Sequence, residues 1–162
     1  MSVQPPAPAA PTVRPVEPAD VPAVIALVTE VLAEFGLAFG KGSATDDALR
    51  ELPGSYAGGG GAFWGATDGA RLLGTCGVFP VAHGAFELRK MYLHRAARGL
   101  RLGTALLDVA IAWSRAHGAD RLVLDTVEEM TRAIAFYEAH GFVRDDAQVR
   151  GARCTRGYAR RL

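Results

Sequence analysis

Residues 86–125 constrain the fold of this chain more than any other segment. They read as an apolar strand, a turn with two glycines in HRAARGLRLGTALL, a helix from about 102 to 117 and a second apolar strand, DRLVLDT. A strand, a helix and a strand in this order form a βαβ unit, in which the two strands lie parallel and the crossover is right-handed. The chain is therefore predicted to contain a parallel pair of strands.

Three strand-like segments at the centre of the chain predict an antiparallel meander. They are AFWGAT, RLLGTCGVF and AFELRKMYL, separated by the strong hairpin signal Asp68–Gly69 and by a looser turn at His83–Gly84. A short strand at TVRPV and one or two strands near the end complete the expected sheet. The predicted class is α+β, with a mixed, mostly antiparallel sheet of about six to seven strands and helices on both faces.

Helices and one glycine-rich loop fill the remaining segments. Helical spacing and capping residues predict helices at about 20–36, 45–52 and 128–140. The segment PGSYAGGGGA contains four consecutive glycines, Gly58 to Gly61, and predicts a mobile loop without a packed element. Tyr56 in this loop is a candidate to cover a substrate, since such loops close over sites.

Composition and charge limit the domain count and the classes of partner. The 162 residues fit one domain over 12–162, after a Pro/Ala-rich tail at 1–11 that we expect to be disordered. The formal net charge of +1 gives no global attraction to nucleic acid or to an anionic membrane. The two cysteines and four histidines show no metal-ligand spacing, so no metal site is expected. With no secretory signal pattern and no apolar run of bilayer length, a cytoplasmic location is expected.

The turn RGLRLG has two interpretations. The start of a helix presents free N–H groups and a partial positive charge, which together bind anions, and Arg98 and Arg101 add mobile charge. Glycines are equally common in an ordinary strand-to-helix turn, which is the alternative. The turn is neither a P-loop nor a dinucleotide fingerprint, because no Gly-Lys-Ser/Thr follows and a third glycine is missing.

A longer pattern around this turn carries more information. ELRKMYLHRAARGLRLGTALLDVAIAWSRAHGADRLVLDT resembles the core of the GNAT superfamily of acetyl-CoA-dependent N-acetyltransferases, and RAIAFYEAHGF resembles the helix that follows in that family. The resemblance spans about residues 71–143. In the family's pyrophosphate motif, Gln/Arg-x-x-Gly-x-Gly/Ala, Arg98 takes the first position and Gly103 the last. Arg101 stands at the internal glycine. We expect a negative φ there, because the backbone N–H of an arginine can then serve the cradle, whereas a positive φ would count against a cradle at this turn.

The resemblance implies how acetyl-CoA, the co-substrate, would bind. Two neighbouring parallel strands, here AFELRKMYL and DRLVLDT, would splay apart and admit the pantetheine arm. The Met91 N–H would also stabilise the acetyl oxygen as negative charge develops there. The residues expected to contact the cofactor are Met91, Tyr92, Leu93, Arg98, Gly99, Leu100, Arg101, Leu102, Gly103, Thr104, Ala133 and Tyr137.

The same resemblance implies two catalytic residues. Glu87 matches a glutamate that removes a proton from the acceptor amine, usually through water, and a salt-bridged or substrate-orienting carboxylate is the alternative. Arg89 is two residues away on the same strand face and favours the route through water. Tyr137 matches a tyrosine aimed at the sulfur, which it would protonate as the thiol leaves, and a core tyrosine is the alternative.

Three functions remain open for the acceptor side. The first is acetylation of a primary amine on a small molecule. Arg89 and the late arginines would suit an acceptor with a carboxylate. Asp125 would either orient the amine or shape a loop. The second is acetylation of a protein N-terminus or lysine, and the third is acyl-CoA binding without catalysis. A homodimer is a possible assembly, since dimers are the commonest oligomers.

Overall fold

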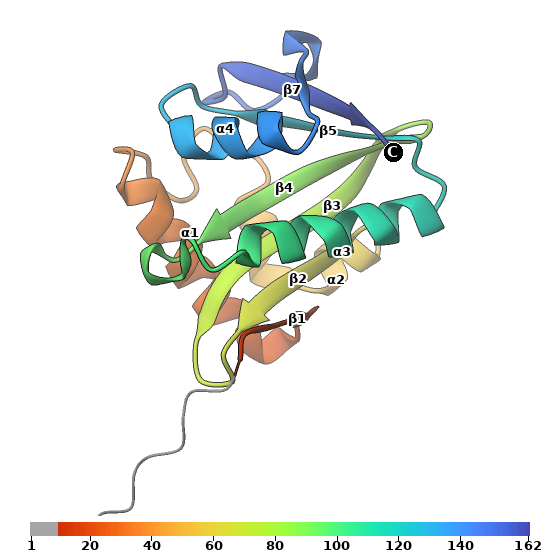
Figure 1. The fold of residues 1–162 in the computed structure, drawn as a ribbon. Helices are drawn as coiled ribbons and strands as arrows, with labels where there is room; N and C mark the ends of the chain where they lie inside the picture. The colour runs from red at the N-terminus through yellow and green to blue at the C-terminus, as the bar shows by residue number, and fades with distance from the viewer. Residues whose placement is uncertain (1–9) are drawn as a thin grey trace, which may run out of the picture.

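The computed structural model describes residues 10–162. Residues 1–9 of the predicted disordered tail lie outside the described residues, and Ala10 and Pro11 are exposed just before the first strand. Seven strands form one sheet in the order β1-β2-β3-β4-β5-β7-β6 (Figure 1). The strands are β1 (Thr12–Pro15), β2 (Ala62–Thr67), β3 (Leu72–Ala82), β4 (Ala85–Leu93), β5 (Arg121–Thr126), β6 (Val143–Arg144) and β7 (Arg156–Arg161).

The mixed, mostly antiparallel sheet expected from the sequence is confirmed. Strands β2, β3 and β4 form the meander, and β4 pairs with β5 in parallel through the βαβ crossover. Every other neighbouring pair of described strands is antiparallel. The helices are α1 (Val21–Ala33), α2 (Gly54–Ala57), α3 (Leu102–Ala116) and α4 (Thr131–Ala139), with a 3₁₀ helix η2 at Asp47–Glu51.

Helices cover both faces of the sheet, and each face has its own core. Helix α3 crosses β2, β3 and β4 on one face and packs there with α4 (Figure 1). Helices α1 and α2, with η2, pack on the opposite face. The alternation of strand residues divides the apolar side chains between the faces: Trp64 lies in the first core and Phe63 in the second.

The prediction that the glycine-rich segment holds no packed element is wrong. Its first residues form α2, and Gly58 to Gly61 then turn directly against β3. A Cβ on Gly61 would lie 2.3 Å from the Val78 carbonyl oxygen, so only glycine permits this approach. Tyr56 is fully buried against Phe63 and Phe79, which places it in the core, where it covers no substrate.

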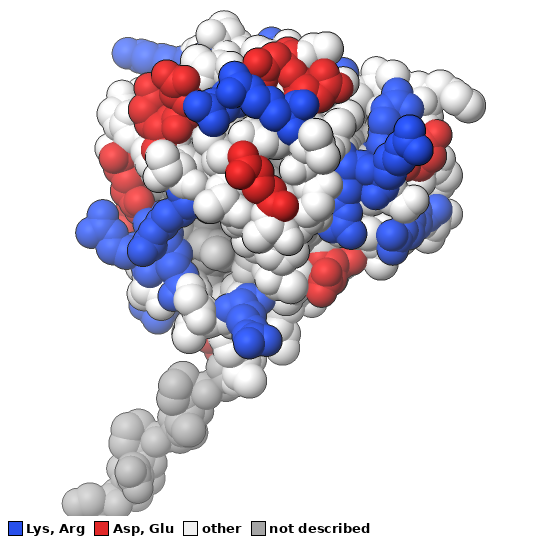
Figure 2. All heavy atoms as spheres, turned by 45° about the horizontal axis from the view of Figure 1, so that its top comes forward, with Lys and Arg blue, Asp and Glu red and all other residues white. Residues whose placement is uncertain are grey.

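No helix within residues 10–162 is long and apolar enough to cross a membrane. Basic and acidic side chains are interspersed on the face that includes β7 and α4 (Figure 2). This mixture agrees with the formal net charge of +1.

Candidate functional site

Strands β4 and β5 separate halfway along their length. Their parallel register comprises only Ala85 with Arg121, Phe86 with Leu122 and Glu87 with Val123. Strand β4 continues to Leu93, while β5 stays paired with β7 over its whole length. Beyond Glu87 the two strands therefore leave a gap in the sheet, as the splayed pair of the sequence prediction requires.

A bulge in β4 lies at this gap. Lys90 and Met91 are the two residues of β4 without a partner in the register with β3, and Lys90 has a positive φ of 53°. The buried Thr75 hydroxyl donates to the Lys90 carbonyl at 2.7 Å and holds the bulge in place. The bulge turns the backbone at Met91 away from the β-ladder, at the point where an extended ligand could run along the strand.

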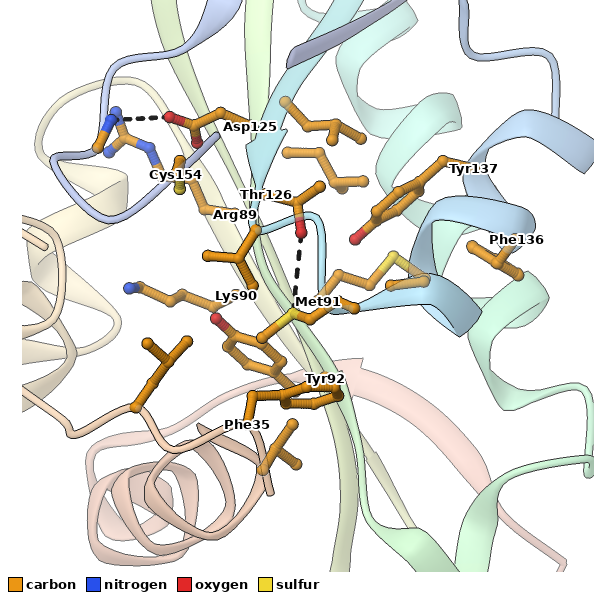
Figure 3. A pocket seen from close by; sticks show the side chains of 18 of the residues that line it. Phe35, Arg89, Lys90, Met91, Tyr92, Asp125, Thr126, Phe136, Tyr137 and Cys154 are labelled. Atoms are coloured by element: carbon orange, nitrogen blue, oxygen red, sulfur yellow. Dashed lines mark hydrogen bonds between the residues drawn. The ribbon is translucent and has the colours of Figure 1, made fainter. Parts of the chain in front are cut away.

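A cavity of about 780 Å³ occupies the gap (Figure 3). This volume suits a small-molecule ligand. Of the residues predicted from the sequence, those that line it are Glu87, Met91, Tyr92, Leu93, Arg98, Gly99, Gly103, Ala133 and Tyr137. Leu100, Arg101, Leu102 and Thr104 belong to the same turn and do not line the cavity itself.

The start of α3 is open to a ligand. Within residues 10–162, no protein group accepts a hydrogen bond from the N–H of Leu102, Gly103 or Thr104, and no side chain caps the helix. Gly103 lets the start of the helix pack closely against two side chains, since a Cβ there would lie 3.3 Å from Phe136 and 3.4 Å from Leu93. Free amides at the start of a helix are groups that can bind an anion, which is the role that the sequence predicts for this turn.

The expectation of a negative φ at Arg101 is wrong. Its φ is 60°, in the left-handed region, directly before the first residue of α3. Glycine adopts this conformation without strain, which explains physically why the resembling motif has glycine at this position. The conformation does not close the turn, because the amides that follow it stay free. Arg101 is exposed, and its neighbour Leu100 is exposed as well.

The Arg98 side chain fixes the turn to the rest of the protein. Its Nη1 lies 2.9 Å from the Glu34 carboxylate at the end of α1, and its Nη2 donates to the Leu93 carbonyl at 3.3 Å. Arg98 thus holds the end of β4 and the end of α1 together beside the cavity. Its charge is already paired with a carboxylate of the protein.

Tyr137 projects from α4 into the cavity from the side opposite Lys90 (Figure 3). Its ring is buried, with edge contacts to Phe136 at 5.8 Å and Phe142 at 5.7 Å between centroids. Burial raises the pKa of the Tyr137 phenol well above its usual range, so the hydroxyl stays protonated at neutral pH. The residue can therefore donate a proton or a hydrogen bond to a group in the cavity.

Glu87 is buried at the other end of the gap and holds two arginines. Arg89 Nε donates to Oε1 at 2.6 Å, as the two-residue spacing on one strand face predicts, and Arg150 Nη1 donates to Oε2 at 3.1 Å. The Arg89 guanidinium also stacks on the Phe79 ring at 4.6 Å. One carboxylate thus pairs with two guanidinium groups that line the cavity.

A second buried carboxylate, Asp46, was not predicted from the sequence. It is fully buried and pairs with Lys90 from the bulge and with Arg153, whose Nη1 lies 3.1 Å away. The Gly40 N–H donates to it at 2.7 Å. Asp46 therefore joins the segment after α1, the β4 bulge and the segment before β7. Its partners lie 44 and 107 residues away, so no local spacing indicates the cluster.

Asp125 shapes a loop beside the same cavity. Its Oδ2 accepts hydrogen bonds from the Arg150 and Gly151 N–H groups, both at 2.7 Å. This is the loop role that the sequence left open. Within residues 10–162 no group of three or more His, Cys, Asp or Glu side chains is arranged to hold a metal ion.

Comparison with known proteins places this architecture among acetyltransferases. The family model described as "Acetyltransferase (GNAT) family" matches residues 28–142. An uncharacterised N-acetyltransferase of Escherichia coli, YjgM, is 34% identical over 140 residues, which cover 84% of each chain. An uncharacterised N-acetyltransferase of Schizosaccharomyces pombe is 32% identical over 118 residues, or 72% of each chain.

Solved structures share the fold at low sequence identity. A GNAT-family acetyltransferase of Staphylococcus aureus superposes with a TM-score of 0.86 at 23% identity, covering 94% of this chain and 99% of the other. The PaiA N-acetyltransferase of Thermoplasma acidophilum, solved in complex with coenzyme A, superposes with a TM-score of 0.71 at 17% identity, covering 94% and 99% of the two chains.

Proposed function

Because the chain belongs to the GNAT family of acetyltransferases, we propose that residues 12–162, as one domain, acetylate the primary amine of a small molecule by direct attack in a ternary complex. Family membership makes the chain an N-acetyltransferase with acetyl-CoA as its acyl donor. The observation that supports the proposal most strongly is the gap between β4 and β5, whose cavity is lined both by Glu87, where the strands separate, and by Tyr137 of α4.

The free amides at the start of α3 would hold the pyrophosphate of the donor. They belong to the turn Arg98–Thr104, which follows the unpaired end of β4. The pantetheine arm would run from there along the backbone of Met91, Tyr92 and Leu93 and past Ala133 of α4. This path brings the thioester to the bulge, where the Met91 N–H would stabilise the developing oxyanion.

The acceptor amine must lose a proton before it attacks. An alkylammonium has a pKa of about 10, so a base is needed at neutral pH. Glu87 would accept this proton, directly or through a water molecule, because its carboxylate lines the cavity at the acceptor end. The amine nitrogen would then form a bond to the acetyl carbon.

The carbon–sulfur bond breaks as this bond forms. The leaving thiolate would take a proton, or a hydrogen bond, from the Tyr137 hydroxyl. Burial keeps this phenol protonated until it is needed. The products are the N-acetylated amine and coenzyme A. The nitrogen would lose a second proton after the new bond forms, and this proton would restore the Tyr137 hydroxyl, while the first proton would pass from Glu87 to solvent.

Two segments that line the acceptor end support a small molecule over a protein as the acceptor. Ser43 and Thr45 from the segment after α1 line the cavity, as do Arg150 and Arg153 from the segment before β7. Asp46 joins these segments across the cavity wall. A protein chain would need an open groove at this place.

Acetylation of a panel of primary amines tests the proposal. Purified protein is incubated with acetyl-CoA, and the acetylated product is identified by mass spectrometry. We expect product with at least one amine and a loss of kcat of about 100-fold or more in Glu87→Gln. The exposed Glu128→Gln is the control and should retain full activity. Tight acetyl-CoA binding without product from any amine would instead indicate a binding module.

A further inference from the structure

The acceptor end of the cavity carries more cations than carboxylates to pair with them. Arg89, Lys90, Arg150 and Arg153 all line it. Glu87 pairs with Arg89 and Arg150, and Asp46 pairs with Lys90 and Arg153. Asp125 adds a third carboxylate, and its Oδ2 is held by backbone N–H groups. The cluster therefore retains an excess of positive charge that an anionic ligand would neutralise.

Only one of these four cations combines exposure with a place beside Glu87. The side chains of Lys90 and Arg153 are 4% and 12% exposed, and that of Arg89 is 18% exposed and stacked on Phe79. The Arg150 side chain is 41% exposed. Its other contacts, to Gln148 at 3.3 and 3.4 Å, lie within its own loop. Arg150 is thus the guanidinium that can turn toward a ligand at small cost.

Arg150 also occupies the oxygen that Glu87 needs for catalysis. Its Nη1 donates to Oε2 at 3.1 Å, while Arg89 holds Oε1 at 2.6 Å. Each oxygen thus already accepts a hydrogen bond from a cation, and Arg150 takes one of the acceptor sites on Oε2. A ligand group that draws Arg150 away would free Oε2 and leave Glu87 oriented by Arg89.

We propose that the acceptor is an amino compound with a carboxylate, such as an amino acid, and that Arg150 leaves Glu87 to bind this carboxylate. The fork of a guanidinium matches a carboxylate in two parallel hydrogen bonds. Binding of the correct acceptor then exposes Glu87 Oε2 to its amine. This inference rests on the proposed function and assigns its substrate class.

Matched pairs of amines test the assignment. Several amino acids are each compared with their carboxamide and with the amine that lacks the carboxyl group, using release of coenzyme A thiol from acetyl-CoA. For the preferred pair we expect kcat/KM to be about 10- to 100-fold higher for the amino acid. Arg150→Gln should lower kcat/KM for the amino acid by a similar factor, mainly through KM, and should not lower kcat/KM for the carboxamide, because loss of the guanidinium also frees Glu87 Oε2. Arg150→Lys should recover part of the loss.

A second arginine provides the control. Arg144 is 51% exposed, pairs with Asp146 and lies outside the cavity. Arg144→Gln should therefore leave kcat/KM unchanged for both members of a pair. Equal or better turnover of the amines without a carboxylate would overturn the inference and leave the proposed function intact. The inference would also fail if Arg150→Gln slowed both members of a pair to the same extent. Acetyl-CoA binding without turnover of any amine would overturn the proposed function as well.

Discussion

The ammonium of Lys90 in the β4 bulge pairs with the carboxylate of Asp46, which is fully buried 44 residues earlier in the chain. Burial alone would raise the pKa of the Asp46 carboxyl. The hydrogen bonds and charges of Lys90, the Gly40 N–H and Arg153 outweigh burial and lower this pKa below its ordinary value of 3.8. The folded protein therefore holds Asp46 ionised.

Asp46→Asn should lower the free energy of unfolding by about 3–5 kcal/mol, because it leaves buried cations without a partner. Since the pKa is lowered on folding, this stabilisation is complete above about pH 4 and is lost as the pH falls through the folded value. Denaturant unfolding at pH 7 and pH 3 measures both effects. The neighbouring Asp47→Asn is the control, since Asp47 is 83% exposed and should cost less than about 1 kcal/mol. Equal losses in the two variants would contradict this role of Asp46.

Tyr137→Phe should reduce kcat by about 10²- to 10⁴-fold and leave the affinity for acetyl-CoA nearly unchanged. Because burial raises the pKa of this phenol, wild-type kcat should show no loss from Tyr137 ionisation up to about pH 10. Steady-state kinetics across this range, with binding measured by calorimetry, check both points. Tyr158→Phe is the matched control, as Tyr158 is equally buried and donates to Glu138 outside the cavity. Full activity in Tyr137→Phe would exclude the phenol as the proton donor.

Arg101→Gly should be about 1 kcal/mol more stable than Arg101→Ala, because only glycine adopts a φ of 60° without strain. Both variants lose the same guanidinium. If backbone amides hold the pyrophosphate, both should bind coenzyme A within about tenfold of wild type. Thermal unfolding and calorimetric titration are the measurements. A loss of affinity beyond about 100-fold in both would mean that the side chain holds the phosphates.

Gly61→Ala should destabilise the fold by about 1–3 kcal/mol, since the added methyl would meet the Val78 carbonyl at 2.3 Å. Gly54→Ala, in the same segment, meets no atom within 4 Å and should be neutral or slightly stabilising. Chemical unfolding of the two variants compares them directly. If both behave alike, the segment is not packed against β3.

Local patterns in the sequence were sufficient to predict the centre of the sheet. The Asp68–Gly69 turn and the alternating segments placed β2 and β4 at their observed residues, and the helix between β4 and β5 dictated the parallel pair. The prediction for the glycine-rich segment was wrong because four residues without side chains do not show which part of the chain packs against them. Only the position of β3 shows that Gly59 and Gly61 allow the segment to pack closely against Val78 and Phe79.

The acceptor end could not be predicted because its contacts span the whole chain. Arg150 reaches Glu87 across 63 residues, and Arg153 reaches Asp46 across 107. Nothing in the spacing of these residues connects them, whereas the turn at Arg98–Thr104 is one continuous segment. The wrong expectation for this turn is the sign of φ at Arg101. An arginine normally has a negative φ, but here it stands at a position where the backbone adopts the conformation of a glycine.

A crystal structure of the protein with coenzyme A is the decisive experiment for the donor site. We expect the pyrophosphate at the N–H groups of Leu102, Gly103 and Thr104, and the pantetheine arm beside Met91 to Leu93 in the gap. The sulfur should lie within hydrogen-bonding reach of the Tyr137 hydroxyl. Coenzyme A bound elsewhere, with the gap between β4 and β5 empty, would refute this assignment.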